Sequence, residues 1–177
     1  MQPYQKLLST KNLSVIALSA AFYVLMSALF GLTLPAARGY PAHFFRGLVM
    51  SAVAAYSGRM WSVTSMSVVA GLVLLGVVPA PAPYLFFSTT AAGLVYDLSL
   101  GKKYADVCRK PRRILAGTLV SGLAEALVAM SILTYVGLFQ AQLQMLAVIW
   151  VGAIAANLVL SAAGAQVTVL VLRRYVK

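Results

Sequence analysis

Six apolar stretches, separated by short polar turns, make up most of this chain. Of its 177 residues, 62% are hydrophobic and only 10% are charged, which is more apolar surface than one soluble core of this size can bury. An α-helix needs about 20 apolar residues to cross the hydrocarbon core of a bilayer. The sequence therefore predicts an all-α integral membrane protein that forms a single domain over residues 1–177.

Each of the six stretches is predicted to cross the membrane, although the second is short and contains Arg46. The first stretch follows Lys6 and Lys11 and is too long for the apolar region of a cleaved signal peptide, so we expect it to be a membrane helix. The expected spans cover residues 13–34, 43–57, 61–78, 84–100, 114–136 and 145–172.

The segment Gly101–Arg113 predicts the orientation of all six spans, because it holds six of the fourteen basic residues. Cytoplasmic loops are enriched in lysine and arginine. Four crossings before this segment and two after it place it, with both termini, on the cytoplasmic side. The uncharged loops at residues 79–83 and 137–144 then lie outside, and only Arg38 and Arg46 lie towards the outer face. We therefore expect a six-transmembrane-helix bundle in the cell membrane.

The net charge of +11 does not indicate a nucleic-acid partner, because the cations occur in short clusters between apolar runs. Membrane topology and anionic lipid headgroups account for such clusters. The single cysteine, Cys108, is expected to be a free cytoplasmic thiol, and the single histidine excludes a histidine-rich metal site. No cofactor or metal is predicted.

Glu125 lies near the middle of the fifth span, where a carboxyl group is costly. Thr118, Ser121 and Gly122 share its helix face, which should point into the bundle. Glu125 is either a ligand-binding or proton-linked carboxylate, or a buried carboxyl group that holds a neighbouring helix. Asp97, at the cytoplasmic end of the fourth span, is expected to have a structural role, paired with a nearby cation or bonded to a backbone donor.

A dense group of aromatic and cationic residues precedes and begins the second span. Its members are Tyr40, His43, Phe44, Phe45 and Arg46. Aromatic rings stack on planar heterocycles and an arginine can bind an anionic group, so the group is a candidate recognition surface. The alternative is an interfacial aromatic belt with an arginine that snorkels to the headgroups.

Trp150 and Asn157 are seven residues apart in the sixth span and share a face, which continues to Ser161. Tyr84 and Ser88 add a ring and a hydroxyl at the outer end of the fourth span. If spans four to six surround a cavity, these residues and Glu125 would line it, as in many small-ligand sites. The alternative for each is ordinary helix packing. The chain has no nucleotide-binding loop, HExxH motif or catalytic triad, so it is not predicted to be an enzyme.

The first span reads IALSAAFYVLMS, and the chain resembles the substrate-binding S component of energy-coupling factor (ECF) vitamin transporters. The pattern HFFRGLVMSAVAAYSGRMWSVTSMSVVAGLV is similar to members assigned to thiamin or its hydroxymethylpyrimidine precursor. The resemblance implies that Ala17 and Ala21 pack against a coupling transmembrane subunit. It also implies capture of a vitamin-like compound at the outer face, by the first outer loop and helices four to six, with ATP-binding subunits driving its release inside.

Two other functions fit a membrane bundle of this size. One is a membrane scaffold similar to the MreD-like proteins of cell-shape complexes, which predicts a filled bundle. The other is a stand-alone proton-linked carrier, for which Glu125 would be indispensable. A binding subunit instead predicts an outer cavity of ligand size, lined by Trp150, Asn157 and Glu125.

Overall fold

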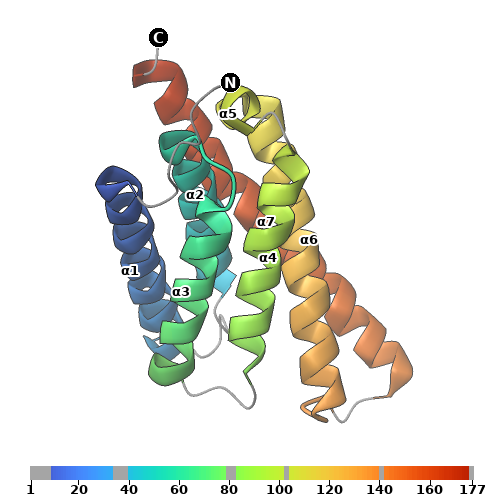
Figure 1. Cartoon of the computed structure of the whole chain (residues 1–177). Helices are drawn as coiled ribbons and strands as arrows, with labels where there is room; N and C mark the ends of the chain where they lie inside the picture. The colour runs from blue at the N-terminus through green and yellow to red at the C-terminus, as the bar shows by residue number, and fades with distance from the viewer. Residues whose placement is uncertain (1–8, 34–39, 79–82, 102–103, 140–141, 176–177) are drawn as a thin grey trace.

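The computed structural model describes residues 9–33, 40–78, 83–101, 104–139 and 142–175. These residues form helices and no strand. The helices are α1 (Thr10–Thr33), α2 (Tyr40–Ser57), α3 (Ser62–Val77), α4 (Tyr84–Leu100), α5 (Tyr104–Val107), α6 (Pro111–Tyr135) and α7 (Leu143–Tyr175). Successive long helices run in opposite directions, so the two ends of the chain lie at the same end of the bundle (Figure 1). The prediction of an all-helical fold is confirmed.

Three helices are long and apolar enough to cross a membrane. They are Thr10–Phe30, Pro111–Tyr135 and Leu143–Arg174. The 16 residues of α3 and 17 residues of α4 rise only about 24–26 Å at 1.5 Å per residue, against a hydrocarbon core of about 30 Å. Helix α2 has 18 residues but carries a buried arginine. All six apolar stretches are thus helices, and three have the length and composition of membrane spans.

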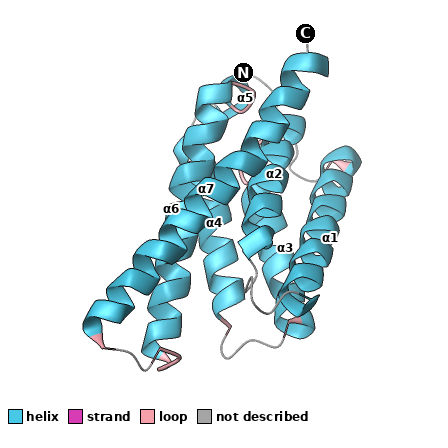
Figure 2. Ribbon diagram, turned by 180° about the vertical axis from the view of Figure 1, so that it is seen from behind, coloured by secondary structure: helices cyan, strands magenta, loops and turns pink. Residues whose placement is uncertain are grey.

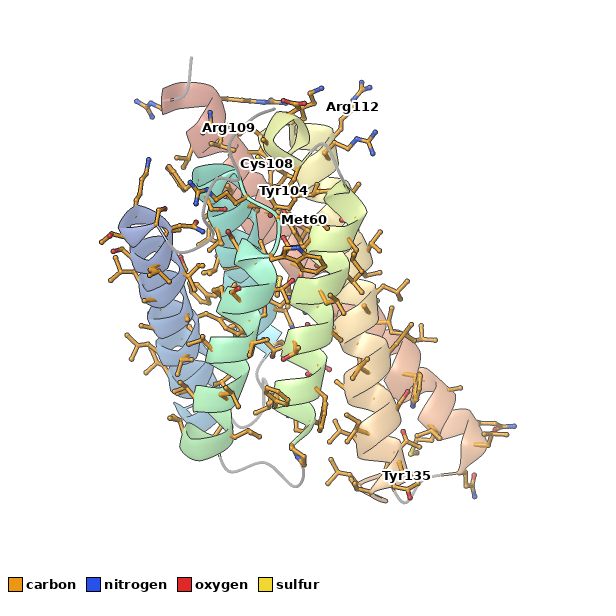
Figure 3. All side chains as sticks on the ribbon, viewed as in Figure 1. Met60, Tyr104, Cys108, Arg109, Arg112 and Tyr135 are labelled. Atoms are coloured by element: carbon orange, nitrogen blue, oxygen red, sulfur yellow. The ribbon has the colours of Figure 1, made fainter. Side chains whose placement is uncertain are left out.

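The charges gather at one end of this bundle. Arg109 and Arg112 lie at the end that also holds the chain termini, and Tyr135 lies at the other end (Figure 3). Every described lysine and arginine except Arg46 lies at or near the helix ends on that side, which we call the basic end. We call the opposite end the far end. The basic residues at positions 6, 38, 102, 103 and 177 lie outside the described residues.

The polar segment at residues 101–113 is more structured than the sequence predicts. Within it, α5 forms one helical turn that places Tyr104 and Cys108 in the main apolar core. The Arg109 Nε donates a 3.1 Å hydrogen bond to the Ala55 carbonyl in the last turn of α2, where a cation is favourable. Cys108 is free, as expected, but fully buried, and burial raises the pKa of its thiol.

The main apolar core lies among helices α1 to α4. Its completely buried side chains include Met50, Val53, Val63, Ala70, Ala92 and Tyr96. A smaller apolar cluster joins α2 to α6 and α7 near the basic end, around Ile114 and Ala165. Seen from behind, α7 runs diagonally across the bundle and packs on both α2 and α6 (Figure 2). It therefore brings the carboxy-terminal part of the chain onto the second helix.

Two glycines allow α2 and α7 to touch at the backbone. A Cβ atom on Gly47 would collide with the backbone of Ser161, and one on Gly164 would collide with the backbone of Phe44. Small residues permit this kind of close approach between membrane helices. Two hydroxyl groups continue the contact, with the Ser51 Oγ donating to the Thr168 Oγ1 at 2.8 Å. The crossing fixes which face of α2 meets α7.

Asp97 anchors the start of α3 from the neighbouring helix α4. Trp61, the residue before α3, has φ 74° and supplies no side-chain cap. The Thr64 backbone N–H and hydroxyl donate to the Asp97 Oδ2 at 2.8 and 2.7 Å instead. Asp97 therefore satisfies an amide of the first turn, the task of an N-cap residue. The sequence predicts a bond from a loop backbone donor, but the donor is Thr64, in the first turn of α3.

Candidate functional site

The most unusual polar residue of the bundle is Arg46, in the second turn of α2. Its side chain has 0% exposure. The close crossing of α2 and α7 directs it between α6 and α7. On α6, Gly122 provides the space, because a Cβ there would lie 3.1 Å from the Arg46 Nη2 and 3.2 Å from the Asn157 Oδ1. The missing side chain of Gly122 thus creates a slot for a guanidinium group.

Three residues from α6 and α7 bond to this guanidinium. The Arg46 Nη1 forms an ion pair with the Glu125 Oε2. The Arg46 Nη2 donates to the Asn157 Oδ1 at 2.6 Å and to the Ser161 Oγ. The Asn157 Nδ2 donates to the Glu125 Oε2 at 2.8 Å, and the Ser161 Oγ donates to the Asn157 Oδ1 at 3.1 Å. With His43, we call these residues the Arg46–Glu125 cluster.

His43 connects this cluster to the surface. It lies about one turn before Arg46 on α2, towards the far end, and its Nδ1 is 3.3 Å from the Glu125 Oε2. Its side chain is 26% exposed, whereas those of Arg46 and Glu125 are 0% and 6% exposed. The histidine backbone carbonyl also accepts a 3.3 Å bond from the Ser161 Oγ. A polar ligand would therefore meet the cluster first at His43.

The cluster lies in the half of the bundle that is nearer the far end. Arg46 is six residues from the start of α2 and Glu125 ten residues from the end of α6, or about 9 and 15 Å along the helix axes. Buried charges at such positions are costly unless they are paired and hydrogen-bonded. The pairing here is incomplete, because the Arg46 Nε has no hydrogen-bond partner among the described residues. The cluster therefore retains an unused donor.

Four predicted site residues are placed elsewhere. Tyr40 and Tyr84 are the first residues of α2 and α4, and the Ser88 Oγ donates to the Leu85 carbonyl of its own helix at 3.5 Å. The Trp150 Nε1 donates to the Thr134 Oγ1 at 3.1 Å and joins α6 to α7. Within the described ranges, no hydrogen bond or ion pair links these four residues to the cluster. At the cluster, α2 supplies the side chain that bonds to α6 and α7, although α4 packs closely along α6.

The interpretation of Arg46 as a snorkelling residue of an aromatic belt needs correction. Arg46 does not snorkel, because it is fully buried and paired with Glu125. The Phe45 ring packs against Phe22 and Phe30 of α1, with ring centroids 5.9 and 5.5 Å apart. These residues belong to the first turns of α2, where a proline at the second position is compatible with helix. Phe45 therefore packs α2 against α1, whereas His43 and Arg46 belong to the Arg46–Glu125 cluster.

The predicted partner residues lie on the outside of α1. Ala17 and Ala21 are exposed, and the neighbouring Leu18 and Leu25 are 72% and 61% exposed. Small side chains on an apolar face suit both lipid contact and close approach of another helix. This face is accordingly open in the isolated chain.

No protein-family model, curated protein or solved structure matches this chain. Across the described residues, no three His, Cys, Asp or Glu side chains gather as ligands for a metal ion. The chemistry of the cluster is that of a paired arginine and glutamate with amide, hydroxyl and imidazole groups around them. Such groups bind polar or charged parts of a ligand.

Proposed function

We propose that this chain is the substrate-binding S component of an ECF-type importer in the cell membrane. On this proposal all six long helices cross the membrane, both termini are cytoplasmic, and the far end faces outwards. The chain captures a vitamin or vitamin precursor, with a thiamin-related compound as the first candidate. A coupling subunit and ATP-binding subunits then complete its transport.

The observation that carries this proposal is the Arg46–Glu125 cluster. Ionisable residues inside a membrane bundle mark ligand or ion sites more often than they mark packing. The Arg46 Nε has no partner among the described residues and is a donor that a ligand could use. His43 is partly exposed on the side of the far end, where a ligand from outside would arrive. The cluster thus offers a few convergent polar groups in an apolar surrounding, as ligand sites do.

The proposal is tested with the purified chain and a panel of water-soluble vitamins that includes thiamin and hydroxymethylpyrimidine. Native mass spectrometry should detect one retained compound, and the same compound should raise the thermal midpoint. Asn157→Ala removes bonds to both Arg46 and Glu125 and should weaken the affinity. Ser51→Ala is the matched control, because it breaks an α2–α7 hydrogen bond outside the cluster and should leave affinity unchanged.

Three results would contradict the proposal. Retention of no compound, with no stabilisation, would favour an MreD-like scaffold. Equal loss of affinity in both variants would show that only the α2–α7 packing matters. Uptake by the chain alone in proteoliposomes, abolished by Glu125→Gln, would indicate a proton-linked carrier.

The coupling interface has a separate test. Ala17→Trp or Ala21→Trp should prevent co-purification with a co-expressed coupling subunit and leave vitamin binding intact. Val159→Trp, at an exposed position on α7, is the control and should not affect co-purification. Unchanged co-purification of the alanine variants would remove α1 from the interface.

A further inference from the structure

A second polar region lies at the basic end, away from the Arg46–Glu125 cluster. A cavity of about 140 Å³ opens between the first turn of α1, the last turn of α2 and the turn between α2 and α3. We call it the basic-end cavity. Its described lining includes two cations and four neutral polar residues: Lys11, Arg59, Ser9, Asn12, Tyr56 and Ser57.

Local backbone structure fixes the walls of this cavity. The Ser9 Oγ accepts a 3.4 Å bond from the Asn12 N–H and so caps the start of α1. Gly58, with φ +61°, closes α2 and turns the chain towards Arg59. The Arg59 backbone N–H donates to the Ser57 Oγ at 3.4 Å within this turn. The two cations therefore come from two separate helix ends, the start of α1 and the turn after α2.

Asn12 ties the two walls together. It is only 4% exposed, and its Nδ2 donates to the Ser62 Oγ in the first turn of α3 at 3.3 Å. This bond joins α1 to the segment that carries Arg59. A buried side-chain contact therefore fixes the spacing of the two backbone segments that carry the cations.

The chemistry of the lining suits a phosphate group. No acidic residue is among the described lining, whereas two cations and several hydroxyl and amide groups are. The volume far exceeds the roughly 10–15 Å³ that one water molecule requires. A phosphate accepts several hydrogen bonds at once and is favoured beside lysine and arginine. The basic end is also where anionic headgroups meet a membrane protein of the proposed orientation.

We propose that the basic-end cavity binds a phosphate group, supplied either by an anionic phospholipid headgroup or by free phosphate. The site is separate from the Arg46–Glu125 cluster and does not depend on its ligand. Lys11 and Arg59 provide the charge, and Ser9, Ser57 and Tyr56 provide hydroxyl groups. A bound headgroup would hold α1 against the turn between α2 and α3.

The test uses the full chain in detergent with two probes. In the first arm, native mass spectrometry compares retention of phosphatidylglycerol and phosphatidylcholine. In the second arm, a thermal-shift titration uses inorganic phosphate. Lys11→Gln combined with Arg59→Gln should reduce the affinity for the bound species about tenfold or more. Lys110→Gln combined with Arg112→Gln is the matched control, because these exposed cations lie outside the cavity.

The outcomes separate the two sources. A lipid headgroup is supported if the chain retains phosphatidylglycerol selectively and only the cavity variant loses this retention. Free phosphate is supported if inorganic phosphate stabilises the chain and only the cavity variant loses this stabilisation. Equal losses of affinity in the cavity and control variants would overturn the proposal in favour of general attraction to headgroups. No loss of affinity in either variant would also overturn it, because Lys11 and Arg59 would then contribute nothing to binding. Lys11→Gln alone changes an exposed side chain, so it repeats the test without disturbing the fold.

Discussion

Removal of Glu125 alone should destabilise the bundle much more than removal of both charges of its ion pair. Glu125→Ala leaves Arg46 fully buried, with Asn157 and Ser161 as its remaining partners. Breaking a buried ion pair by deleting one partner costs about 3–5 kcal/mol. Since two neutral partners remain, we expect the lower limit, about 3 kcal/mol.

The double variant Arg46→Met with Glu125→Leu replaces the pair by apolar side chains of similar size. Such replacements are often neutral or stabilise a protein by about 1–4 kcal/mol. The Asn157 Oδ1 keeps the Ser161 Oγ as a donor at 3.1 Å, but the Asn157 Nδ2 loses its acceptor Glu125, which costs about 1–3 kcal/mol. The double variant should therefore be close in stability to the unmodified chain and clearly more stable than Glu125→Ala.

Thermal unfolding in one detergent, followed by tryptophan fluorescence, measures both effects. At about 2–4 °C per kcal/mol for a chain of this length, Glu125→Ala should lower the apparent midpoint by about 6–12 °C. A decrease below about 2 °C would refute the reasoning, because it would match an exposed and solvent-screened pair. The stable double variant should also bind no vitamin, and retained affinity would make the cluster purely structural.

Three further predictions concern positions outside the cluster. Gly164→Ala should lower the free energy of unfolding by about 1–3 kcal/mol, because its Cβ would push α7 away from the α2 backbone. Gly152→Ala is the control: its Cβ would have no atom within 4 Å, so the change should be neutral or slightly stabilising. The thermal midpoints of the two variants test this difference. Asp97→Ala removes the cap of α3 and should lower the free energy of unfolding by about 1–2 kcal/mol. The control Asp106→Ala changes an exposed side chain and should lower it by less than about 0.5 kcal/mol. Equal thermal midpoints of the two variants would contradict the capping role. Burial raises the pKa of the Cys108 thiol, so alkylation by iodoacetamide at pH 8 should be at least about tenfold slower in the folded than in the unfolded chain, as mass spectrometry would show. Because the unfolded thiol loses its proton first, the stability that this thiol contributes should also fall as the pH rises past about 8.5.

Much of the helical arrangement could be predicted, because it follows from the lengths of the apolar stretches. Each predicted stretch is a helix, and the bounds differ by a few residues. Glu125 and its buried face were also predictable, since a carboxyl group and small polar residues recur at helical spacing on a span that must hide them. Asn157 and Ser161, four residues apart, follow the same rule.

The partner of Glu125 could not be predicted in this way. Periodicity identifies the inward face of a helix but does not indicate which helix that face meets. The choice of α2 depends on Gly47 and Gly164, whose missing side chains allow a backbone contact between segments more than 100 residues apart in the sequence. In the sequence, a glycine at a packed helix crossing cannot be distinguished from a glycine on an open helix face. Gly152 is of the second kind, because a Cβ atom there would meet nothing within 4 Å. For the same reason the sequence pattern places Tyr84 and Ser88 with Glu125, although no hydrogen bond or ion pair among the described residues joins them to the cluster.

The buried arginine also affects how the chain is made. In the proposed topology α2 enters the membrane early, and an arginine at a helix centre costs about 2.5–3.5 kcal/mol on insertion. Its partners Asn157 and Ser161 are synthesised 111 and 115 residues later, which takes roughly 5–25 s at 5–20 residues per second. Its ionic partner Glu125 is made earlier, 79 residues after Arg46, which takes roughly 4–16 s at the same rate. On the proposed topology α2 therefore carries an unpaired charge until α6 is made, and the later arrival of α7 completes the hydrogen bonds of a helix made long before it.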